Sequence, residues 1–555
     1  MQAGNTLLKS RPLAPVAALL AIGALMGCPI GPSRFAQARP QSARPSVASP
    51  GGTRAGDASR PNIVLILTDD LSMDLLPYMP HVQAMERAGL TFSDYFVSDS
   101  LCCPSRSSIF IGDFPHDTHV YSNTGADGGF QKFHDLGEEE HTFAVALQDA
   151  GYRTALMGKY LNDYMQLPPS AGVPDSYIPP GWSEWDVAGW GYREYDYNLN
   201  EDGTIHHFGH QPSDYLTSVL ANKAADFING SLTASAPFFL EVATFAPHFP
   251  YEPAPQDEHS FPGIRAPQPP SFDRLPADAP RWLAAHGPLA PTQVREIDRV
   301  FRRRVRSVQA VDRLVGLIEG TLIADGLADN TYLVFSSDNG LHVGQYRLMP
   351  GKLTAFDTDI HVPLVVVGPG VAPGTTTTAV SENVDLAETF ASIASTTLSG
   401  DGHSLLPLFS GVTPADWRAA ALIEHHGPDL RGFDPDFQQP ASGNPRTYEA
   451  MRTQQFLYVE YADGEREFYD LQSDPFELHN LAGRLATDTQ ALLHQELTDI
   501  EDCHGAQSCW AAMGGGQQAG FNVPDPSHLA AHGELGNNRP RRHAPATTVI
   551  RPPKR

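Results

Sequence analysis

Two acidic pairs follow segments with the pattern of buried strands, and their residue types suit a metal site. Asp69 and Asp70 come directly after the apolar run 62–68, and Asp338 and Asn339 end another such run. Three carboxylates and an amide oxygen are hard ligands, which suit Ca²⁺ or Mg²⁺ better than Zn²⁺. A helix N-cap or a turn is the alternative for one Asp-Asp pair alone. The second pair after another strand favours the metal site.

Four further side chains could supply positive charge and a proton to the same place. They are Arg106, four residues after Cys102, Lys159 in Met-Gly-Lys-Tyr, His248 in Ala-Pro-His-Phe-Pro and Lys352 in Pro-Gly-Lys. Cleavage of an anionic ester requires fixed cations and a proton donor for the leaving group. Each residue alone is more typical of a solvated or structural position, but their common location near strand ends favours a shared site.

The elements that must position these side chains alternate between strands and helices. Continuous apolar, β-branched runs predict buried strands at 62–68, 238–243, 331–336 and 362–367. Helical patterns lie at 81–88, 142–150, 215–227 and 291–323. This order predicts an α/β fold with a large mixed, mostly parallel sheet between helices. In such folds the ligand site lies at the carboxyl ends of the strands.

The pattern changes after about residue 408. Short strands are predicted at 420–423, 456–461 and 467–471, with a helix at 488–500, which indicates a smaller C-terminal antiparallel α+β domain. Pro-rich stretches at 168–182 and 251–280 are typical of surface loops near the site. The predicted organisation is a signal peptide at 1–28, a disordered linker at 29–60, a catalytic domain at 61–408, a C-terminal domain at 409–512 and a flexible tail at 513–555.

The run Cys102-Cys103-Pro104-Ser105-Arg106, continued by Ser-Ser-Ile and closed by Gly112, resembles the motif of the type I sulfatases. In that family the first cysteine of a Cys-x-Pro-Ser-Arg pentapeptide is oxidised to formylglycine, whose hydrated aldehyde attacks sulfur. The resemblance implies an alkaline-phosphatase-like fold, bound Ca²⁺ with Mg²⁺ as the alternative, and a formylglycine-generating enzyme as a maturation partner. Two buried thiols at the start of a helix are the alternative interpretation.

The resemblance also implies roles for the residues already described. The metal ligands would be Asp69, Asp70, Asp338, Asn339 and the converted Cys102. Lys159 and Lys352 resemble the sulfate-binding lysines, His248 the proton donor to the leaving oxygen, and Arg106 the arginine that orients formylglycine.

The segment after Lys159 departs from the family pattern. Many arylsulfatases have Gly-Lys-Trp-His there, whereas this chain has Gly-Lys-Tyr-Leu-Asn. Asn162 and His119 are therefore two further candidates for the missing polar group, and the role of each stays open.

Several segments together resemble the N-acetylglucosamine-6-sulfatase branch, which includes the heparan endosulfatases. They are 101–106, 158–162, 180–182 and 338–345. This resemblance implies sulfate-ester hydrolysis on 6-O-sulfated N-acetylglucosamine or related glycosaminoglycan units. The alternatives are a broad arylsulfatase, a phosphodiesterase or phosphonate hydrolase on the same scaffold, and a non-catalytic glycan-binding lipoprotein. The complete set of candidate residues argues against the last.

The charge of the chain limits its partners. The 555 residues include 38 Lys and Arg against 64 Asp and Glu, a formal net charge of -26. The negative electrostatic field of such a chain repels polyanions, which argues against non-specific nucleic-acid binding. An anionic substrate must therefore meet a locally positive pocket.

The N-terminal segment predicts export. Lys9 and Arg11 precede an apolar run at 13–26 that suits a signal peptide, and no second hydrophobic span follows. Leu-Met-Gly-Cys at 25–28 resembles a bacterial lipobox, which predicts a lipid on Cys28 and a cell-envelope location, with periplasmic or secreted protein as the alternative. In an exported protein, Cys503 and Cys509 predict a disulfide. A zinc site is the competing interpretation, although only His504 lies nearby.

Overall fold

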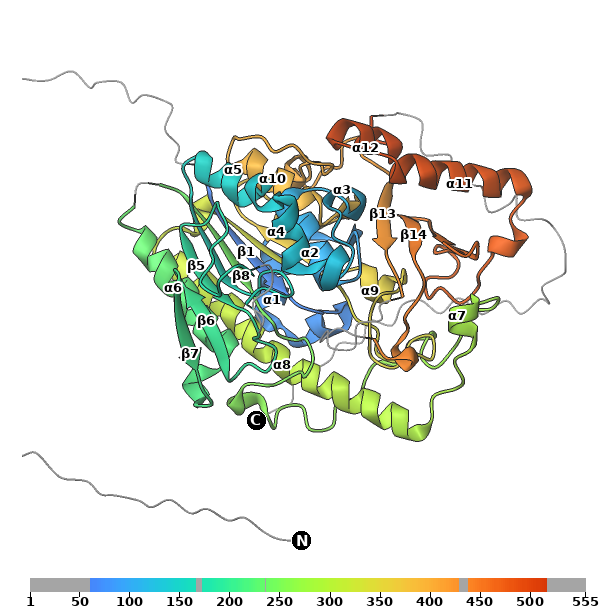
Figure 1. The fold of residues 1–555 in the computed structure, drawn as a ribbon, viewed down its shortest axis with the longest axis horizontal. Coiled ribbons are helices and arrows are strands. Elements are labelled where there is room, and N and C mark those ends of the chain that lie inside the picture. Colours follow the sequence, from blue (N-terminus) through green and yellow to red (C-terminus); the bar gives the residue numbers. More distant parts are fainter. Residues whose placement is uncertain (1–59, 166–171, 235, 429–437, 517–555) are drawn as a thin grey trace, which may run out of the picture. The chain divides into compact units, whose positions relative to one another are not determined.

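The computed structural model describes residues 60–165, 172–234, 236–428 and 438–516 (Figure 1). The predicted signal peptide with Cys28, the linker before residue 60 and the tail beyond 516 lie outside the described residues. The predicted boundary between a catalytic domain ending at 408 and a C-terminal domain stays a prediction.

Within the described residues, ten strands form one large mixed sheet in the order β11-β2-β10-β9-β1-β8-β4-β5-β6-β7. The strands are β1 (Asn62–Thr68), β2 (Leu90–Phe92), β4 (Arg153–Gly158), β5 (Glu184–Ala188), β6 (Tyr197–Glu201), β7 (Thr204–Phe208), β8 (Phe238–Ala243), β9 (Thr331–Ser337), β10 (Leu364–Val367) and β11 (Thr375–Thr377). The five central strands, β9-β1-β8-β4-β5, are parallel. The predicted fold class is therefore confirmed.

Helices cover both faces of this sheet (Figure 1). One face carries α1 (Pro80–Ala88), α6 (Leu216–Ser231) and α8 (Pro291–Ala324), and the other carries α2 (Cys102–Ile111), α4 (Gly129–Leu136), α5 (Phe143–Asp149) and α10 (Asp385–Ile393). Side chains of β1 alternate between the two cores, with Leu65 on the α2 side and Val64 on the α8 side. A strand buried on both faces explains why its sequence is continuously apolar.

The C-terminal part contains a four-stranded antiparallel sheet, formed by β13 (Ala420–His425), β14 (Tyr448–Thr453), β15 (Phe456–Tyr461) and β16 (Arg466–Asp470). Ile423 of β13 belongs to the same core as α2, whereas Leu422 packs with Leu497 of α11 (Thr487–Glu501). The remaining short elements are β3 (Tyr95–Phe96), β12 (Ser381–Glu382), α3 (Pro115–Thr118), α7 (Arg281–Ala284), α9 (Asp357–Ile360) and α12 (Ala506–Ala512).

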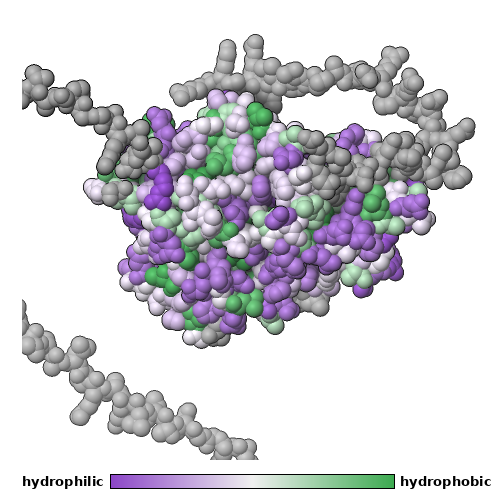
Figure 2. Space-filling model, turned by 90° about the horizontal axis from the view of Figure 1, so that it is seen from above, coloured by the Kyte–Doolittle hydropathy of each residue, from purple (hydrophilic) through white to green (hydrophobic). Residues whose placement is uncertain are grey.

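The surface of the described residues is mixed in polarity. On the face drawn in Figure 2, hydrophilic residues are interspersed with small hydrophobic patches. Exposed large hydrophobic residues such as Trp190, Phe249 and Val412 are normal when they occur singly. Among the described residues, no helix is both long and apolar enough to cross a bilayer.

One acidic side chain lies in the middle of the central sheet. Glu241 of β8 is fully buried on the face of the sheet that α2, the helix of Arg106, covers. Neither of its carboxyl oxygens has a hydrogen-bond partner among the described residues. Burial raises the pKa of Glu241 to about 8, and the positive charge of Arg106 only partly opposes this. The carboxyl is therefore mostly neutral in the fold at pH 7, where an unfolded glutamate is ionised.

We expect Glu241→Gln to raise the free energy of unfolding at pH 7 by about 2 kcal/mol. Because the pKa is raised on folding, the wild type loses stability as the pH rises from about 4.5 to about 8. The glutamine variant lacks this loss, so the difference in the free energy of unfolding between the two proteins should shrink toward pH 5. Urea unfolding of both proteins between pH 5 and pH 8 measures this difference. Parallel pH profiles for the two proteins would contradict the expectation.

Candidate active site

Six of the predicted site residues follow four neighbouring parallel strands, β9, β1, β8 and β4. Asp69 and Asp70 follow β1, Asp338 and Asn339 follow β9, His248 comes five residues after β8, and Lys159 directly follows β4. Because the carboxyl ends of parallel strands meet at one edge, side chains from four distant segments converge there.

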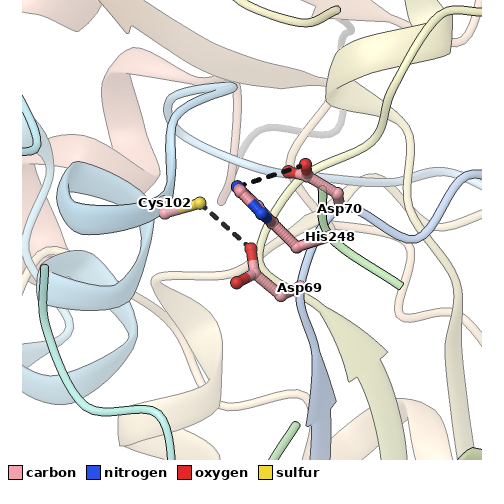
Figure 3. A group of neighbouring side chains, drawn as sticks. All are labelled: Asp69, Asp70, Cys102 and His248. Atoms are coloured by element: carbon pink, nitrogen blue, oxygen red, sulfur yellow. Dashed lines mark hydrogen bonds and ion pairs between the residues drawn. The ribbon is translucent and has the colours of Figure 1, made fainter. Parts of the chain in front are cut away.

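Cys102 lies at the first position of α2 and points to this edge (Figure 3). Its Sγ lies 3.1 Å from Asp69 Oδ1, 3.4 Å from Asn339 Oδ1 and 2.9 Å from Lys352 Nζ. The side chain is fully buried, as is Cys103 beside it. Burial raises the pKa of the Cys103 thiol to about 12, so Cys103 stays a neutral thiol.

Each predicted cation contacts a predicted metal ligand. Lys159 Nζ lies 2.6 Å from Asp69 Oδ2, Lys352 Nζ lies 2.7 Å from Asp70 Oδ1, and Arg106 Nε lies 2.7 Å from Asp338 Oδ2. All six side chains are almost completely buried. Buried charges are tolerated when they are paired, so the three cations and three carboxylates form one balanced cluster.

The electrostatics of the cluster differ between its members: burial raises the pKa of Asp69 despite its contact with Lys159, whereas Asp338 and Lys159 are held in their charged forms. Burial alone raises the pKa of Asp338, but Arg106, Lys159 and Lys352 outweigh it and hold that pKa below the ordinary value. Burial alone lowers the pKa of Lys159, but the neighbouring Asp69 reverses the effect, so the pKa is raised well above the ordinary value. Asp338 therefore stays a carboxylate and Lys159 an ammonium at neutral pH.

Gly158 explains how Lys159 reaches the site. Its φ of +108° is rare for residues with a side chain, and an added Cβ would lie 1.9 Å from the backbone oxygen of Ala243 in β8. Only glycine allows this approach, which lets Lys159 N donate a hydrogen bond of 2.8 Å to the same oxygen. From this position the ammonium of Lys159 reaches Asp69.

His248 has a defined orientation. Its Nδ1 lies 2.7 Å from the backbone oxygen of Phe249, which assigns a proton to Nδ1, and its Nε2 lies 3.7 Å from Asp70 Oδ2 (Figure 3). The Tyr192 ring packs against the imidazole at 4.7 Å between centroids. Nε2 is therefore the ring nitrogen that faces the acidic cluster.

The two candidates for the missing polar group lie in different environments. Asn162 is buried, and its Nδ2 donates a hydrogen bond of 3.3 Å to the Tyr192 hydroxyl, which places it next to the residues around His248. His119 is exposed, and its ring contacts Tyr121. The structure thus brings Asn162 to the edge of the site and leaves His119 on the surface.

Arg304 of α8 is a site residue that the sequence analysis missed. It is fully buried, its Nη2 donates to the backbone oxygen of Asp70, and its Nη1 donates to Ser72 Oγ at 3.0 Å. This contact holds Asp70 in a left-handed backbone conformation with a φ of 63°. A signal was present, because Arg304 falls on the apolar stripe of α8 between Phe301 and Val308.

A divalent cation fits the residues at this edge. Ligand atoms of Asp69, Asp70, Cys102 and His248 all lie within 4.8 Å of one another, and Asn339 contributes an amide group at the same place. The carboxylates of Asp69 and Asp70 and the amide of Asn339 are the donor chemistry of Ca²⁺ and Mg²⁺. The predicted ligand Asp338 pairs with Arg106 and is not a member of this group, whereas His248 is. In the structure Asp69 and Asp70 form ion pairs with Lys159 and Lys352. A bound metal would take the place of these lysines as the partner of the two carboxylates.

The other two cysteines among the described residues form a disulfide. Cys503 and Cys509 are joined with an S–S distance of 2.04 Å, close to the end of α11. The pairing agrees with the prediction for an exported chain.

Two family models match the chain. The model described as "Sulfatase" matches residues 61–396, and the model described as "N-sulphoglucosamine sulphohydrolase, C-terminal" matches residues 344–502. The N-acetylglucosamine-6-sulfatase of Homo sapiens is 34% identical over 487 residues, which cover 82% of this chain and 86% of that protein. An arylsulfatase of Volvox carteri is 30% identical over 510 residues, covering 82% and 77%.

Solved structures share the fold. One is a protein in complex with its substrate D-glucosamine-2-N,6-O-disulfate, with a TM-score of 0.66 and 22% identity, covering 80% of this chain and 97% of the other. Another is a phosphonate monoester hydrolase of Agrobacterium radiobacter, with a TM-score of 0.61 and 21% identity, covering 80% and 95%. At these identities the likeness establishes the architecture alone.

Proposed function

Because the chain belongs to the sulfatase family and is therefore a sulfuric ester hydrolase, we propose that it removes the 6-O-sulfate from N-acetylglucosamine or related glycosaminoglycan units. The relatives named for N-acetylglucosamine-6-sulfate support this substrate class, since each aligns over most of this chain. A structural neighbour solved with a 6-O-sulfated glucosamine adds support at the level of the fold.

The charge balance around Cys102 is the observation that best supports hydrolysis of an anionic ester. Three carboxylates, Asp69, Asp70 and Asp338, are matched by three cations, Arg106, Lys159 and Lys352. A divalent metal added to this neutral cluster would leave it positive. An otherwise acidic protein would thus offer an anionic sulfate a local attractive site.

Two groups complete the proposed site. A Ca²⁺ or Mg²⁺ ion held by Asp69, Asp70, Asp338 and Asn339 would stabilise negative charge on the sulfate oxygens. Conversion of Cys102 to formylglycine by a formylglycine-generating enzyme would supply a hydrated aldehyde as the nucleophile.

The chain's own side chains supply the remaining functions. Lys159 and Lys352, which now pair with the carboxylates, lie where they can bind sulfate oxygens once a metal neutralises Asp69 and Asp70. As the imidazolium, with its Nδ1 proton bonded to the Phe249 carbonyl, His248 would donate its Nε2 proton to the departing alcohol and be left as the neutral ring. Arg106 positions the site by binding both Asp338 and the backbone oxygen of Lys159.

A substrate panel tests the function. We expect the Ca²⁺-loaded, formylglycine-containing enzyme to release sulfate from N-acetylglucosamine 6-sulfate faster than from its 3-sulfate or 4-sulfate isomers. A phosphonate monoester and a phosphate diester with the same leaving group serve as rival substrates. Faster cleavage of either rival than of the sulfate ester would replace the proposal by a phosphonate or phosphodiester hydrolase. Equal rates on all sulfate isomers and aryl sulfates would indicate a broad arylsulfatase.

The leaving group should reveal the role of His248. We expect His248→Asn to lower kcat/KM for the sugar 6-sulfate by about 100-fold, because an alkoxide needs a proton as it departs. For 4-nitrophenyl sulfate, whose phenolate departs without one, the loss should stay below about threefold. Steady-state kinetics on both esters measures the contrast, and equal losses on the two substrates would contradict proton donation.

We also propose that the mature protein is exported and anchored by a lipid on Cys28, or else released to the periplasm or medium. The basic and apolar N-terminal segment and the Leu-Met-Gly-Cys sequence support this location. Mass spectrometry of the N-terminal peptide from membrane and soluble fractions tests it. A peptide that begins at Met1 in the mature protein would exclude export by this route.

A further inference from the structure

A second group of metal-ligating side chains lies outside the active site. His116 and Asp117 belong to α3, shortly after α2, and His504 lies between the disulfide-bonded Cys503 and Cys509. Their ligand atoms lie within 4.8 Å of one another, although 387 positions separate Asp117 from His504 in the chain. His504 Nδ1 is 2.6 Å from Asp117 Oδ1, and His116 Nε2 is 3.9 Å from Asp117 Oδ2.

One contact of His116 matches that of a metal-bound histidine. Its Nδ1 lies 2.9 Å from Glu424 Oε2, while its Nε2, which would bind the ion, donates a hydrogen bond of 2.8 Å to the backbone oxygen of Cys503 that the ion would replace. Ligating histidines commonly donate the second ring N–H to a carboxylate, which orients the ring. Glu424 is itself held, because its backbone N donates to the backbone oxygen of Ser98 at 2.8 Å. Glu424 is thus held in a position from which it orients the His116 ring.

The local charge favours a cation. Asp113 and Asp401 lie beside Asp117, and burial together with these two carboxylates raises the pKa of Asp113 to about 8. Acidic side chains thus lie close together beside the two histidines, and a divalent ion would offset their negative charge.

We propose that His116, Asp117 and His504 form a second metal site for Zn²⁺ or a similar borderline ion. Two imidazoles and one carboxylate suit Zn²⁺ rather than Ca²⁺, whose ligands are oxygens. Atoms bound to one Zn²⁺ at about 2.1 Å lie about 3.4 Å apart in a tetrahedron, which small side-chain rotations here would reach. The ion would connect α3 to the C-terminal disulfide loop and would displace the Nε2 proton of His116.

Zinc titration of the full-length enzyme tests the site. Excess Ca²⁺ first occupies the acidic cluster around Asp69. We then expect isothermal titration calorimetry to show one more Zn²⁺ equivalent for the wild type than for His504→Ala. His494→Ala is the matched control, since His494 is exposed and pairs with Glu460 at 3.0 Å outside the cluster.

Thermal unfolding gives a second readout. Zinc at about 100 times its Kd should raise the Tm of the wild type and of His494→Ala by about 3 °C, and should leave that of His504→Ala unchanged. Because His504 is largely exposed, its replacement should not prevent folding. Equal zinc stoichiometry and equal Tm shifts in the wild type and His504→Ala would overturn the proposal. None of these measurements depends on which ester the active site cleaves.

Discussion

Replacing Cys102 by alanine is expected to lower kcat for sulfate-ester hydrolysis by about 10⁴-fold or more. The variant can neither be oxidised to an aldehyde nor provide a nucleophile at the first turn of α2. Sγ of Cys102 contacts Asp69, Asn339 and Lys352, so no other nucleophilic side chain takes its place among these contacts. Sulfate release from N-acetylglucosamine 6-sulfate, compared with that of the wild type, measures the loss.

Cys103→Ala is the matched control. Cys103 is equally buried on the same helix turn, but it packs into the apolar core and its backbone N donates to Asn123. We expect its turnover to stay within about threefold of the wild type. Peptide mass spectrometry should show a loss of about 18 Da at Cys102 and none at Cys103. Wild-type turnover in Cys102→Ala would refute the proposed nucleophile.

Lys352→Met is expected to lower kcat/KM by about 10³-fold at saturating Ca²⁺. Lys352 contacts both Asp70 and Cys102, and its ammonium is 1% exposed, so its charge acts in a dry site where water cannot replace it. Methionine keeps most of the side-chain volume and removes the charge. Because Asp70 loses its partner, we also expect the metal-free variant to be less stable by about 3 kcal/mol.

The control is Lys223→Met. Lys223 of α6 pairs with Asp186 at 3.0 Å and Glu201 at 3.1 Å, is partly exposed and lies on the opposite face of the sheet from α2. Its replacement should change kcat/KM by less than about twofold. Steady-state kinetics and urea unfolding with and without Ca²⁺ separate the two effects. A Lys352→Met enzyme that retains more than a third of the wild-type kcat/KM would contradict a sulfate-binding role.

Local patterns predicted the central part of the fold. The strands β1, β8 and β9 were expected within one residue of their ends, because strands buried on both faces consist mainly of apolar residues. Several strands were not predicted, among them β4, which precedes Lys159, and the short strands β5, β6 and β14. Their residues mix apolar, polar and aromatic side chains, since each of these strands is stabilised by pairing with a neighbour rather than by its own composition.

Some residues of the candidate site were likewise predicted from the sequence, and others were missed. Asp69, Asp70 and Cys102 were predicted because each belongs to a short contiguous motif whose residue types indicate its chemistry. Arg304 was missed, because its role depends on the backbone of a residue 234 positions away. The local sequence pattern also did not predict which carboxylate each lysine contacts.

The sequence by itself determined the family, the residues that could perform the chemistry and most of the strands and helices that carry them, although not β4. These features depend on residue types within a few positions of one another. Only the tertiary structure decided that Arg106, Lys159 and Lys352 neutralise three carboxylates, that His119 stays on the surface while Asn162 is buried, and that His504 meets His116. Such contacts join segments far apart in the chain, and sheet order and core packing, which no local pattern encodes, bring them together.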